Sequence, residues 1–376
     1  MENYEIIPDS SELITTNSES DPVIALEQRL NRNKRNGKES FESFTDYELI
    51  YYYIYRHSNV FKGSDSRKDS TKNAYKQILL NFYNLLLQIL NKDGYNIQEG
   101  QSVFLLTKDY HLNLYIKALQ QYISPKTGKS YKKSTIHQYV TVMRQFMKWL
   151  YNKDILEKDL TKDLPSVALS PEDLPDRDLY LDTVRDVLSY YKERNLQRYA
   201  IILCGAVTGL RLTATANIKM SDITYEPIDG KYFYVLKVKE KRDKIRYAVI
   251  HPEIFNELVS PKKRLGKPTM IGPGAEGYLF EMTNGKKYST AYLSKSVSAW
   301  FDEYTRETNQ VEKNITYHHL RHFYSIYAFE KLGKSPEEIR NALLHKSIDT
   351  TNIYLSNVLK KENDIGKDLN VSDFLI

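Results

Sequence analysis

The sequence is poor in cysteine and in long apolar runs, and both shortages narrow the class of protein. Its 376 residues include one cysteine, Cys204, so no disulfide can form within the chain. Cys204 follows the apolar run Ile201-Ile202-Leu203, which is typical of a buried core residue and not of a reactive thiol. No run of about 18 apolar residues is present to span a bilayer, and the first residues lack the basic and apolar regions of a signal peptide. We therefore expect a protein of the reducing cytoplasm with no membrane segment.

The excess of positive charge is also small. The chain has 54 Lys and Arg residues against 48 Asp and Glu residues, which gives a net charge of +6. This excess alone is weak evidence for a polyanionic partner, so the placement of the charges matters more than their sum. Because 41% of the residues are hydrophobic, the chain can bury real cores, which argues against global disorder.

A chain of this length predicts two domains and an additional terminal segment. Residues 1–20 hold five acidic residues and no Lys or Arg, which predicts an acidic tail. Pro165, Pro171 and Pro175 interrupt every periodic pattern and predict a linker. The predicted segments are an N-terminal extension at 1–59, whose helical part could contact DNA or protein, a helical domain at 60–157, a linker at 158–177, and a second domain at 178–376 that includes a C-terminal tail.

The first domain is predicted to be helical. Between Thr71 and Leu90 apolar residues recur every three or four positions, which predicts a helix with a broad buried face. A second such helix carries apolar residues from Ile136 to Leu150. A basic loop precedes it and contains Lys126, Lys129, Lys132 and Lys133. Lysines beside a helix start suit backbone phosphates, so these four are predicted DNA contacts, with ordinary solvated lysines as the alternative.

The second domain is predicted to combine helices with a small antiparallel sheet. An apolar helix through Tyr199–Val207 ends at Gly209, a typical C-terminal cap. A tight-turn pair and two stretches rich in β-branched and aromatic residues predict a β-hairpin. These parts are Asp229-Gly230, Lys231–Lys239 and Ile245–Ile250. Helices are expected to resume near Ala291. The predicted fold class is therefore mainly α with a small antiparallel β-sheet.

Histidines are concentrated near the end of the chain. Four of the eight lie within 28 residues, at His318, His319, His322 and His345. A helix is predicted to start there with Thr316 as N-cap. On it His318 and Arg321 share a face, so an imidazole and a guanidinium can converge on one ligand. Zinc is the rival ligand, but Cys204 is remote and an arginine would oppose a metal cation. We therefore predict no metal site.

Two more helix starts follow. The motif Ser335-Pro336-Glu337-Glu338 combines an N-cap serine, a proline at the first helical position and a capping-box glutamate. That helix should end near Leu344, so His345 opens a short connection to a further start at Asp349. The last helix presents Tyr354. Because the chain has 31 tyrosines, Tyr354 alone proves nothing.

Taken together, these residues resemble the C-terminal signature of the tyrosine recombinases, the phage integrase family. The resemblance rests on His318-His319-Leu320-Arg321-His322 and on the run from Leu344-His345 to Tyr354, nine residues after the histidine. Upstream, Thr208-Gly209-Leu210-Arg211 is similar to the first arginine box of the family. The hairpin matches the one that bears the family's lysine, which points to Lys239, with Lys241 as the second choice and a predicted DNA contact.

The resemblance covers residues 178–360 strongly and extends weakly to 60–157 as a helical core-binding domain. It implies a mixed α/β catalytic domain whose catalytic residues are Arg211, Lys239, His318, Arg321, His345 and Tyr354. Two guanidinium groups would hold the non-bridging oxygens of a DNA phosphate, and Tyr354 would attack the phosphorus. His318 would accept the tyrosine proton, His345 would hydrogen-bond the phosphate, and a lysine would protonate the leaving oxygen.

The implied activity is that of a site-specific DNA recombinase, which cleaves and rejoins strands through a 3′-phosphotyrosyl intermediate. The covalent link conserves the bond energy, so no metal, ATP or other cofactor is expected. The implied partners are double-stranded DNA and further copies of the chain in a tetramer, with an accessory protein as a further candidate. Integration or excision of a phage or mobile element is the expected task.

Two positions depart from the family pattern. Ala214 stands where the family usually has an acidic residue three positions after its first arginine, which leaves Arg211 without its usual support. Leu344 stands where a glycine normally precedes the second histidine, which could shift His345. A catalytically silent DNA-binding regulator on the same fold is therefore the alternative function, and a type IB topoisomerase is a weaker one.

Overall fold

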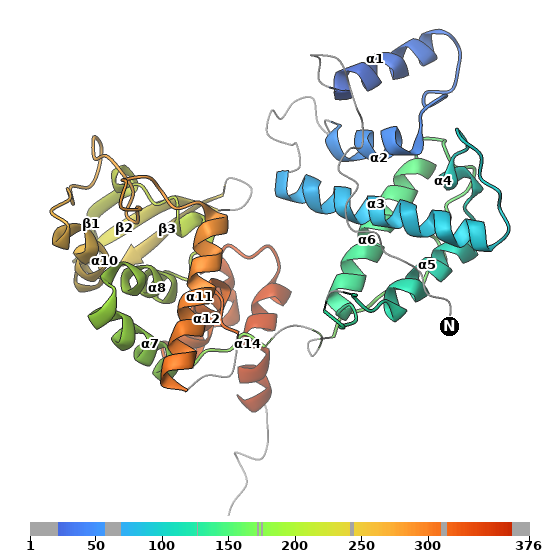
Figure 1. Cartoon of the computed structure of the whole chain (residues 1–376). Coiled ribbons are helices and arrows are strands. Elements are labelled where there is room, and N and C mark those ends of the chain that lie inside the picture. The colour runs from blue at the N-terminus through green and yellow to red at the C-terminus, as the bar shows by residue number, and fades with distance from the viewer. Residues whose placement is uncertain are drawn as a thin grey trace, which may run out of the picture. The chain divides into compact units, whose positions relative to one another are not determined.

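The structure is a computed structural model in which the chain divides into two compact units, Met1–Leu174 and Pro175–Ile376 (Figure 1). It describes residues 22–56, 69–125, 127–170, 173, 176–240, 244–309 and 314–362, with the backbone alone at 357 and 360–362. The predicted acidic tail, the C-terminal tail, Lys126 and Lys241 lie outside the described residues.

The first unit is built mainly from helices. They are α1 (Pro22–Arg35), α2 (Asp46–Tyr55), α3 (Asp69–Lys92), α4 (Val103–Leu106), α5 (Asp109–Gln121) and α6 (Lys133–Tyr151). The two helices predicted from apolar periodicity are α3 and α6, and both predictions are confirmed. Their apolar faces are buried because residues three and four positions apart lie on the same side of a helix.

The core of this unit includes residues from the predicted extension and the predicted linker. Leu49 and Ile50 of α2 are buried in the same cluster as α3 and α6, and so are Leu160 and Leu164. Arg144 of α6 also donates a hydrogen bond to the Leu164 carbonyl at 2.6 Å. The chain thus stays packed on the helical unit well past α6, because its apolar residues continue there.

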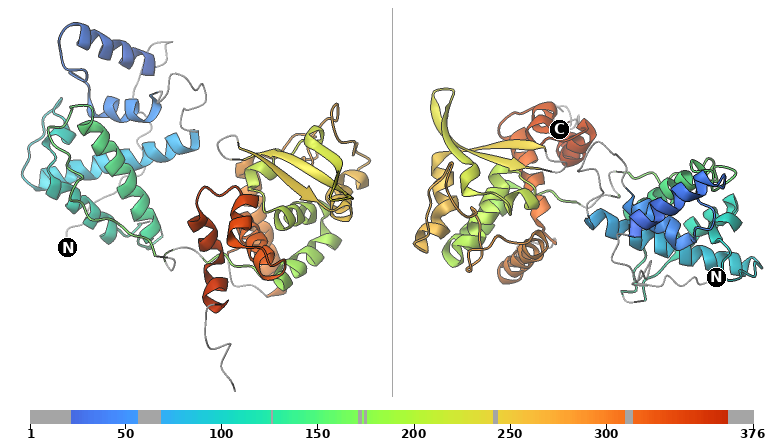
Figure 2. Two further views of the ribbon diagram at one scale, coloured as in Figure 1. Left: turned by 180° about the vertical axis from the view of Figure 1, so that it is seen from behind. Right: turned by 90° about the horizontal axis from the view of Figure 1, so that it is seen from above.

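The second unit combines eight helices of four or more residues with one sheet among its described residues. The helices are α7 (Leu181–Arg194), α8 (Leu196–Thr208), α9 (Leu212–Thr215), α10 (Pro252–Arg264), α11 (Thr290–Thr308), α12 (Tyr317–Glu330), α13 (Pro336–Ala342) and α14 (Ile348–Glu362). The strands are β1 (Ile223–Ile228), β2 (Lys231–Lys239) and β3 (Ile245–Ile250), antiparallel in the order β1-β2-β3. Figure 2 shows the strands side by side, with helices packed beneath them. The predicted fold class is confirmed.

Two elements of this unit escaped sequence reasoning. β1 pairs with β2, so the Asp229-Gly230 turn, with φ of 50° and 77°, joins β1 to β2 and does not merely precede a two-stranded hairpin. β1 contains Pro227, which is tolerated because the strand lies at the edge of the sheet. The expectation that helices resume only near Ala291 was wrong, because α10 begins with Pro252 at a position that favours proline.

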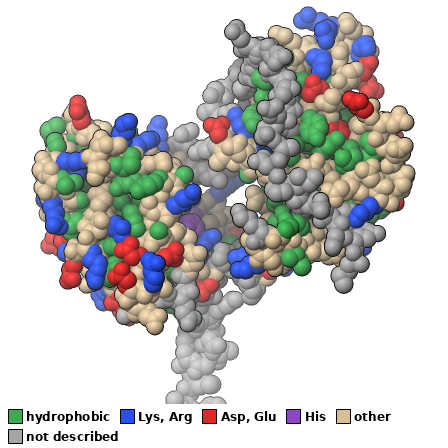
Figure 3. Space-filling view, in the orientation of Figure 1, with side chains coloured by type: hydrophobic (Ala, Val, Ile, Leu, Met, Phe, Trp, Pro, Cys, Tyr) green, Lys and Arg blue, Asp and Glu red, His purple; other side chains and the backbone are tan. Residues whose placement is uncertain are grey.

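The surface agrees with the small net charge. Figure 3 shows Lys and Arg side chains interspersed with Asp and Glu over the visible face of each unit. Among the residues that the structure describes, no helix combines the length and the apolar character needed to cross a membrane.

Gly209 fixes how α8 meets α12. It ends α8 in the left-handed conformation with φ of 57°, as predicted for a C-terminal cap. A Cβ atom at this position would lie 2.8 Å from the ring of Tyr324 on α12, so only glycine allows this approach. The contact brings the chain around Arg211 next to the helix that carries Arg321.

Candidate active site

Arg321 is the most deeply buried charged residue of the site. It lies on α12 with 1% of its surface exposed. Its Nη1 donates to the Gly209 carbonyl at 2.7 Å and its Nη2 donates to the Leu343 carbonyl at 2.6 Å. Burial, and then the charge of Arg211, lowers the pKa of Arg321 to about 10, so it stays cationic near neutral pH. Arg321 therefore ties the ends of α8 and α13 to α12.

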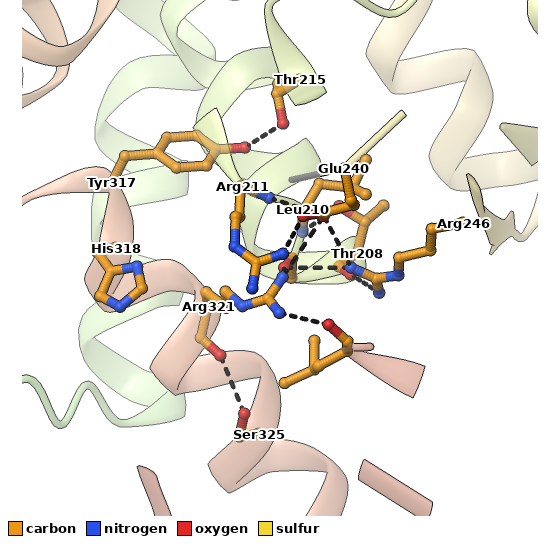
Figure 4. A network of polar contacts seen from close by, with 12 residues as sticks. Thr208, Leu210, Arg211, Thr215, Glu240, Arg246, Tyr317, His318, Arg321 and Ser325 are labelled. Atoms are coloured by element: carbon orange, nitrogen blue, oxygen red, sulfur yellow. Dashed lines mark hydrogen bonds and ion pairs between the residues drawn. The ribbon is translucent and has the colours of Figure 1, made fainter. Parts of the chain in front are cut away.

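A carboxylate links Arg321 to Arg211. Glu240 follows β2, and its side chain is only 1% exposed. It forms a hydrogen-bonded ion pair with Arg211 Nη1, and its Oε1 lies 3.6 Å from Arg321 Nη1 and 3.9 Å from Arg246 Nη1. Figure 4 shows Glu240 among the three guanidinium groups. We call Arg211, Arg321, Arg246 and Glu240 the arginine cluster.

Tyr354 on α14 lies in a pocket of aromatic rings. Its Oη is 3.0 Å from Nε2 of His318, the residue predicted to accept its proton. Its ring stacks on His322 with centroids 3.8 Å apart and meets the His345 ring edge-on at 4.9 Å. His319 is occupied elsewhere, because its Nδ1 accepts the Thr316 backbone N–H at 3.0 Å and so caps α12. We call Tyr354, His318, His322 and His345 the tyrosine pocket.

The three pocket histidines are neutral near pH 7. Burial, followed by the charge of Arg177, lowers the pKa of His318 to about 4. Burial is also the main cause for the other two, and it lowers the pKa of His322 to about 2 and that of His345 to about 3. A neutral imidazole has a free lone pair, so His318 can accept a proton at the nitrogen that faces Tyr354.

His345 has one nitrogen engaged and one available. Its Nδ1 lies 2.9 Å from the hydroxyl of Thr351, which is fully buried on α14. Its Nε2 is buried and has no hydrogen-bond partner among the described residues. Leu344, the departure from the family glycine, adopts the left-handed conformation with φ of 52°. The backbone before His345 therefore takes the shape that glycine favours, at the cost of local strain.

The predicted lysines that the structure describes are not joined to these groups. Lys239 is exposed at the end of β2, and no hydrogen bond or ion pair links its side chain to the arginine cluster or the tyrosine pocket in the part of the chain described. Lys129 and Lys132 in the basic loop are exposed. Lys133 is half-exposed and pairs with Asp173 at 2.7 Å, so part of its charge is already matched. Lys126 and Lys241 lie outside the described residues.

A metal site does not emerge from this geometry. Within the described ranges, no three His, Cys, Asp or Glu side chains come together as candidate metal ligands. The histidines of the pocket contact the Tyr354 ring instead.

Comparison with known families identifies the chain. The model of the phage integrase family matches residues 177–360, which include the arginine cluster and the tyrosine pocket. Residues 177–360 belong to the phage integrase, or tyrosine recombinase, family. The family predicted from the sequence is therefore confirmed.

Individual recombinases align over most of the chain. A tyrosine recombinase of Thermosipho africanus is 24% identical over 330 residues, covering 87% of this chain and 98% of that protein. The structure of XerH recombinase bound to palindromic difH substrate has a TM-score of 0.56 at 16% identity, covering 92% of this chain and 96% of that one. The Tn1549 transposon integrase in complex with circular intermediate DNA has a TM-score of 0.56 at 17% identity, covering 82% and 94%. These structures share the recombinase fold.

Four residues of this recombinase site were missed by sequence reasoning. Glu240 and Arg246 complete the arginine cluster, His322 stacks on the nucleophile candidate, and Thr351 contacts His345. His322 gave a signal as part of the histidine concentration, and Thr351 lies in the run from Leu344 to Tyr354, six residues after His345. Glu240 and Arg246 reach the site through tertiary contacts that no local spacing reveals.

Proposed function

We propose that this tyrosine recombinase cleaves and rejoins DNA strands at a specific site, with Tyr354 as the nucleophile. The observation that carries the proposal is the 3.0 Å contact between Tyr354 Oη and Nε2 of a neutral histidine, His318. A phenol has a pKa of about 10, so it needs such an acceptor to attack near neutral pH.

In the proposed step, the Tyr354 oxygen bonds to the phosphorus as its proton passes to His318 Nε2. The bond from phosphorus to the 5′ oxygen breaks, and that oxygen takes a proton from Lys239, or from Lys241 as the second choice. The products are a 3′-phosphotyrosyl link and a free 5′ hydroxyl. Since the link keeps the energy of the phosphodiester, the reverse step can join another strand without ATP.

The arginine cluster supplies the charge that this step requires. A phosphodiester is an anion, and planar guanidinium groups can hold its non-bridging oxygens in pairs of hydrogen bonds. Arg211 is the more accessible candidate, because its side chain is 34% exposed while that of Arg321 is buried. Arg321 would donate hydrogen bonds to the phosphate from its remaining N–H groups.

His345 would add one more donor. When the Thr351 hydroxyl donates to Nδ1, the proton of the neutral imidazole resides on Nε2, the nitrogen that has no partner among the described residues. That N–H can then donate to a phosphate oxygen. The proposed role thus follows from the tautomer that Thr351 selects.

Double-stranded DNA is the proposed substrate, and a tetramer on two duplexes is the proposed assembly. Support comes from the XerH structure, which is bound to palindromic difH substrate, and from the Tn1549 integrase structure, which is in complex with circular intermediate DNA. The likeness to a transposon integrase also favours a task in the movement of a mobile element. An accessory protein stays a prediction from the sequence.

The decisive experiment is capture of the covalent intermediate. A random pool of duplexes is selected for binding, and the bound sequence is rebuilt with a nick so that a cleaved strand diffuses away. We expect wild-type protein to form a covalent adduct in excess chelator. Tyr354→Phe should form none, with nearly unchanged DNA affinity, because the lost hydroxyl carries no binding charge.

An adduct formed by Tyr354→Phe would show that another residue attacks. If wild-type protein binds the selected duplex and never becomes attached, the catalytically silent regulator is the correct function. An absolute need for a divalent ion would contradict the proposed chemistry.

The basic loop is proposed to contact DNA phosphates. Lys129 and Lys132 are exposed, and each phosphate contact contributes about 0.9 to the slope of log affinity against log salt concentration. Replacing both by glutamine should lower this slope by roughly 1 to 2 and leave sequence preference intact. Lys133→Gln is the control, with a smaller effect because Asp173 already pairs with this lysine. A salt titration in which the double variant keeps the wild-type slope would identify these lysines as ordinary solvated surface.

A further inference from the structure

Glu240 is the buried carboxylate among three arginines, and the reaction proposed above assigns it no role. Its side chain forms a hydrogen-bonded ion pair with Arg211, the more exposed guanidinium of the cluster. Oε1 also lies 3.6 Å from Arg321 and 3.9 Å from Arg246. Three cations held this close repel one another, and Glu240 is the acidic partner shared by all three among the described residues.

The backbone gives Glu240 a second contact with Arg211. Arg211 is the N-cap of α9, and its N–H lies 3.5 Å from Glu240 Oε1, a long hydrogen bond. In a capping box, this N–H is accepted by an acidic or amide side chain at the third helical position. In α9 that position is Ala214, which has no acceptor. Glu240 therefore supplies from the end of β2 what the α9 sequence does not.

The position of Glu240 is itself fixed. Its N–H donates to the Lys244 carbonyl at 2.8 Å, which extends the pairing of β2 with β3 by one residue. Burial of Val238 and Glu240 and exposure of Lys239 follow the alternation of a strand. The carboxylate consequently reaches Arg211 from the end of the β2–β3 pairing, while Lys239 is on the exposed face of the strand.

We propose that Glu240 is the positioning residue for the phosphate clamp of this recombinase: it holds the Arg211 guanidinium and backbone where they meet the scissile phosphate, in place of an acid at position 214. The inference rests on the proposed function. It also resolves the departure at Ala214, because the support that Arg211 lacks in its own helix comes from the sheet.

The primary test compares Glu240→Gln with wild type on the selected nicked duplex. Glutamine keeps the shape and removes the charge, so Arg211 loses its ionic partner. We expect adduct formation to slow by about 10²- to 10³-fold, as when one preorganised donor is lost, while the Kd for the duplex stays within about threefold. Glu226→Gln, which changes the same charge at an exposed position of β1, is the matched control and should react at the wild-type rate.

A modified substrate separates the clamp from the lysine beside Glu240. When a sulfur atom replaces the 5′ bridging oxygen, the leaving group departs without being protonated, so a defect in the proton donor disappears. The Glu240→Gln defect should persist on this substrate, because it lies in the clamp. Recovery of the wild-type rate would show that Glu240 acts through Lys239 and would overturn the proposal.

Further variants guard against unfolding. Glu240→Asp keeps the buried charge and withdraws it by one methylene. This variant should fold, and its adduct formation should be about tenfold slower than that of wild type. Ala214→Glu added to Glu240→Gln should recover at least about tenfold in rate, because it restores an acceptor at the third position of α9. Folded Glu240 variants that react as fast as wild type would overturn the inference. A wild-type protein that never forms an adduct would instead defeat the proposed function.

Discussion

The arginine cluster is held together by charge, whereas the tyrosine pocket is held together by neutral rings. Arg211, Arg321 and Arg246 surround one carboxylate, and Arg321 and Arg246 also cap the carbonyl end of α8. Tyr354 instead stacks on His322 and meets two further imidazoles whose pKa values burial has lowered. The arginine cluster thus concentrates positive charge. The tyrosine pocket keeps its proton acceptor, His318, uncharged beside Tyr354.

This difference determines how each half can fail. A buried ion-pair network depends on every partner, because removal of one leaves the others uncompensated. A stack of neutral rings tolerates a change of ring but not the gain of a charge. Substitutions should therefore damage the arginine cluster most, and a change of pH should damage the tyrosine pocket most.

The largest effect is expected from Arg321→Lys. An ammonium group cannot reproduce the planar fork that donates to Gly209 and Leu343, although the charge is kept. We expect the free energy of unfolding to fall by about 3 kcal/mol and adduct formation to be lost. Urea denaturation measures the first effect and the nicked duplex the second.

Arg198→Lys is the matched control for this prediction. Arg198 donates from Nη1 to both carboxylate oxygens of Glu303, at 2.9 and 2.8 Å, but this pair is partly exposed. A partly exposed pair contributes about 0 to 1 kcal/mol, so the control should lose little. Equal losses of unfolding free energy in Arg321→Lys and Arg198→Lys would mean that burial of the arginine cluster does not increase its contribution to stability.

The tyrosine pocket should be sensitive to acid. Histidine has a pKa of about 6.5 in an unfolded chain, against about 4 for His318 and about 3 for His345 in the folded protein. Between these values the unfolded chain binds more protons than the folded one, so the free energy of unfolding falls as the pH falls. It should be highest above pH 6.5 and decline from there towards pH 4.

His322→Phe sharpens this prediction. Phenylalanine keeps a ring against Tyr354 and removes two buried nitrogens that have no hydrogen-bond partner in the described chain. The loss of stability between pH 7 and pH 5 should shrink by about 1 to 2 kcal/mol, one histidine's share. Thermal unfolding at several pH values provides the measurement. A variant with the wild-type pH dependence would show that His322 does not titrate as proposed.

The smallest change in stability is expected at Leu344, where the arginine cluster and the tyrosine pocket join. Leu344 lies between Leu343, whose carbonyl accepts from Arg321, and His345, and its φ of 52° suits glycine better than leucine. Leu344→Gly should raise the free energy of unfolding by about 0.5 to 1 kcal/mol. Ala342→Gly, at the end of α13, should lower it by a similar amount. Shifts of the same sign in both variants would contradict the proposed strain.

The sequence predicted the parts of the site that depend on local spacing. His318 and Arg321 were placed on one helix because they are three residues apart, and Ser335 caps α13 through Glu338 as its motif indicates. Gly209 was recognised because helices end in this conformation. In each case a few neighbouring residues specify the structure.

The rest depends on contacts between distant segments. Glu240 is 29 residues from Arg211 and 81 residues from Arg321 in the sequence, so no local pattern around it predicts its role. The sequence predicts only that Arg246 belongs to a strand. Its place in the arginine cluster depends on the packing of β3 against the end of α8. Lys133 was grouped with its neighbours because no local pattern connects it to Asp173. Tertiary packing, and not propensity, decides these positions.

The hydrogen bond from Arg321 to the Gly209 carbonyl also bears on the order of folding. It joins residues 112 positions apart, whereas Tyr354 and His318 are 36 positions apart. The entropic cost of closing a loop rises with the logarithm of its length, so closing the 112-residue loop costs about 1 kcal/mol more than closing the 36-residue loop. We expect α12 and α14 to bring the tyrosine to its acceptor first, and the longer loop to close afterwards. A partly folded chain would then carry the nucleophile before it can hold a phosphate, and it could not cut DNA until its fold is complete.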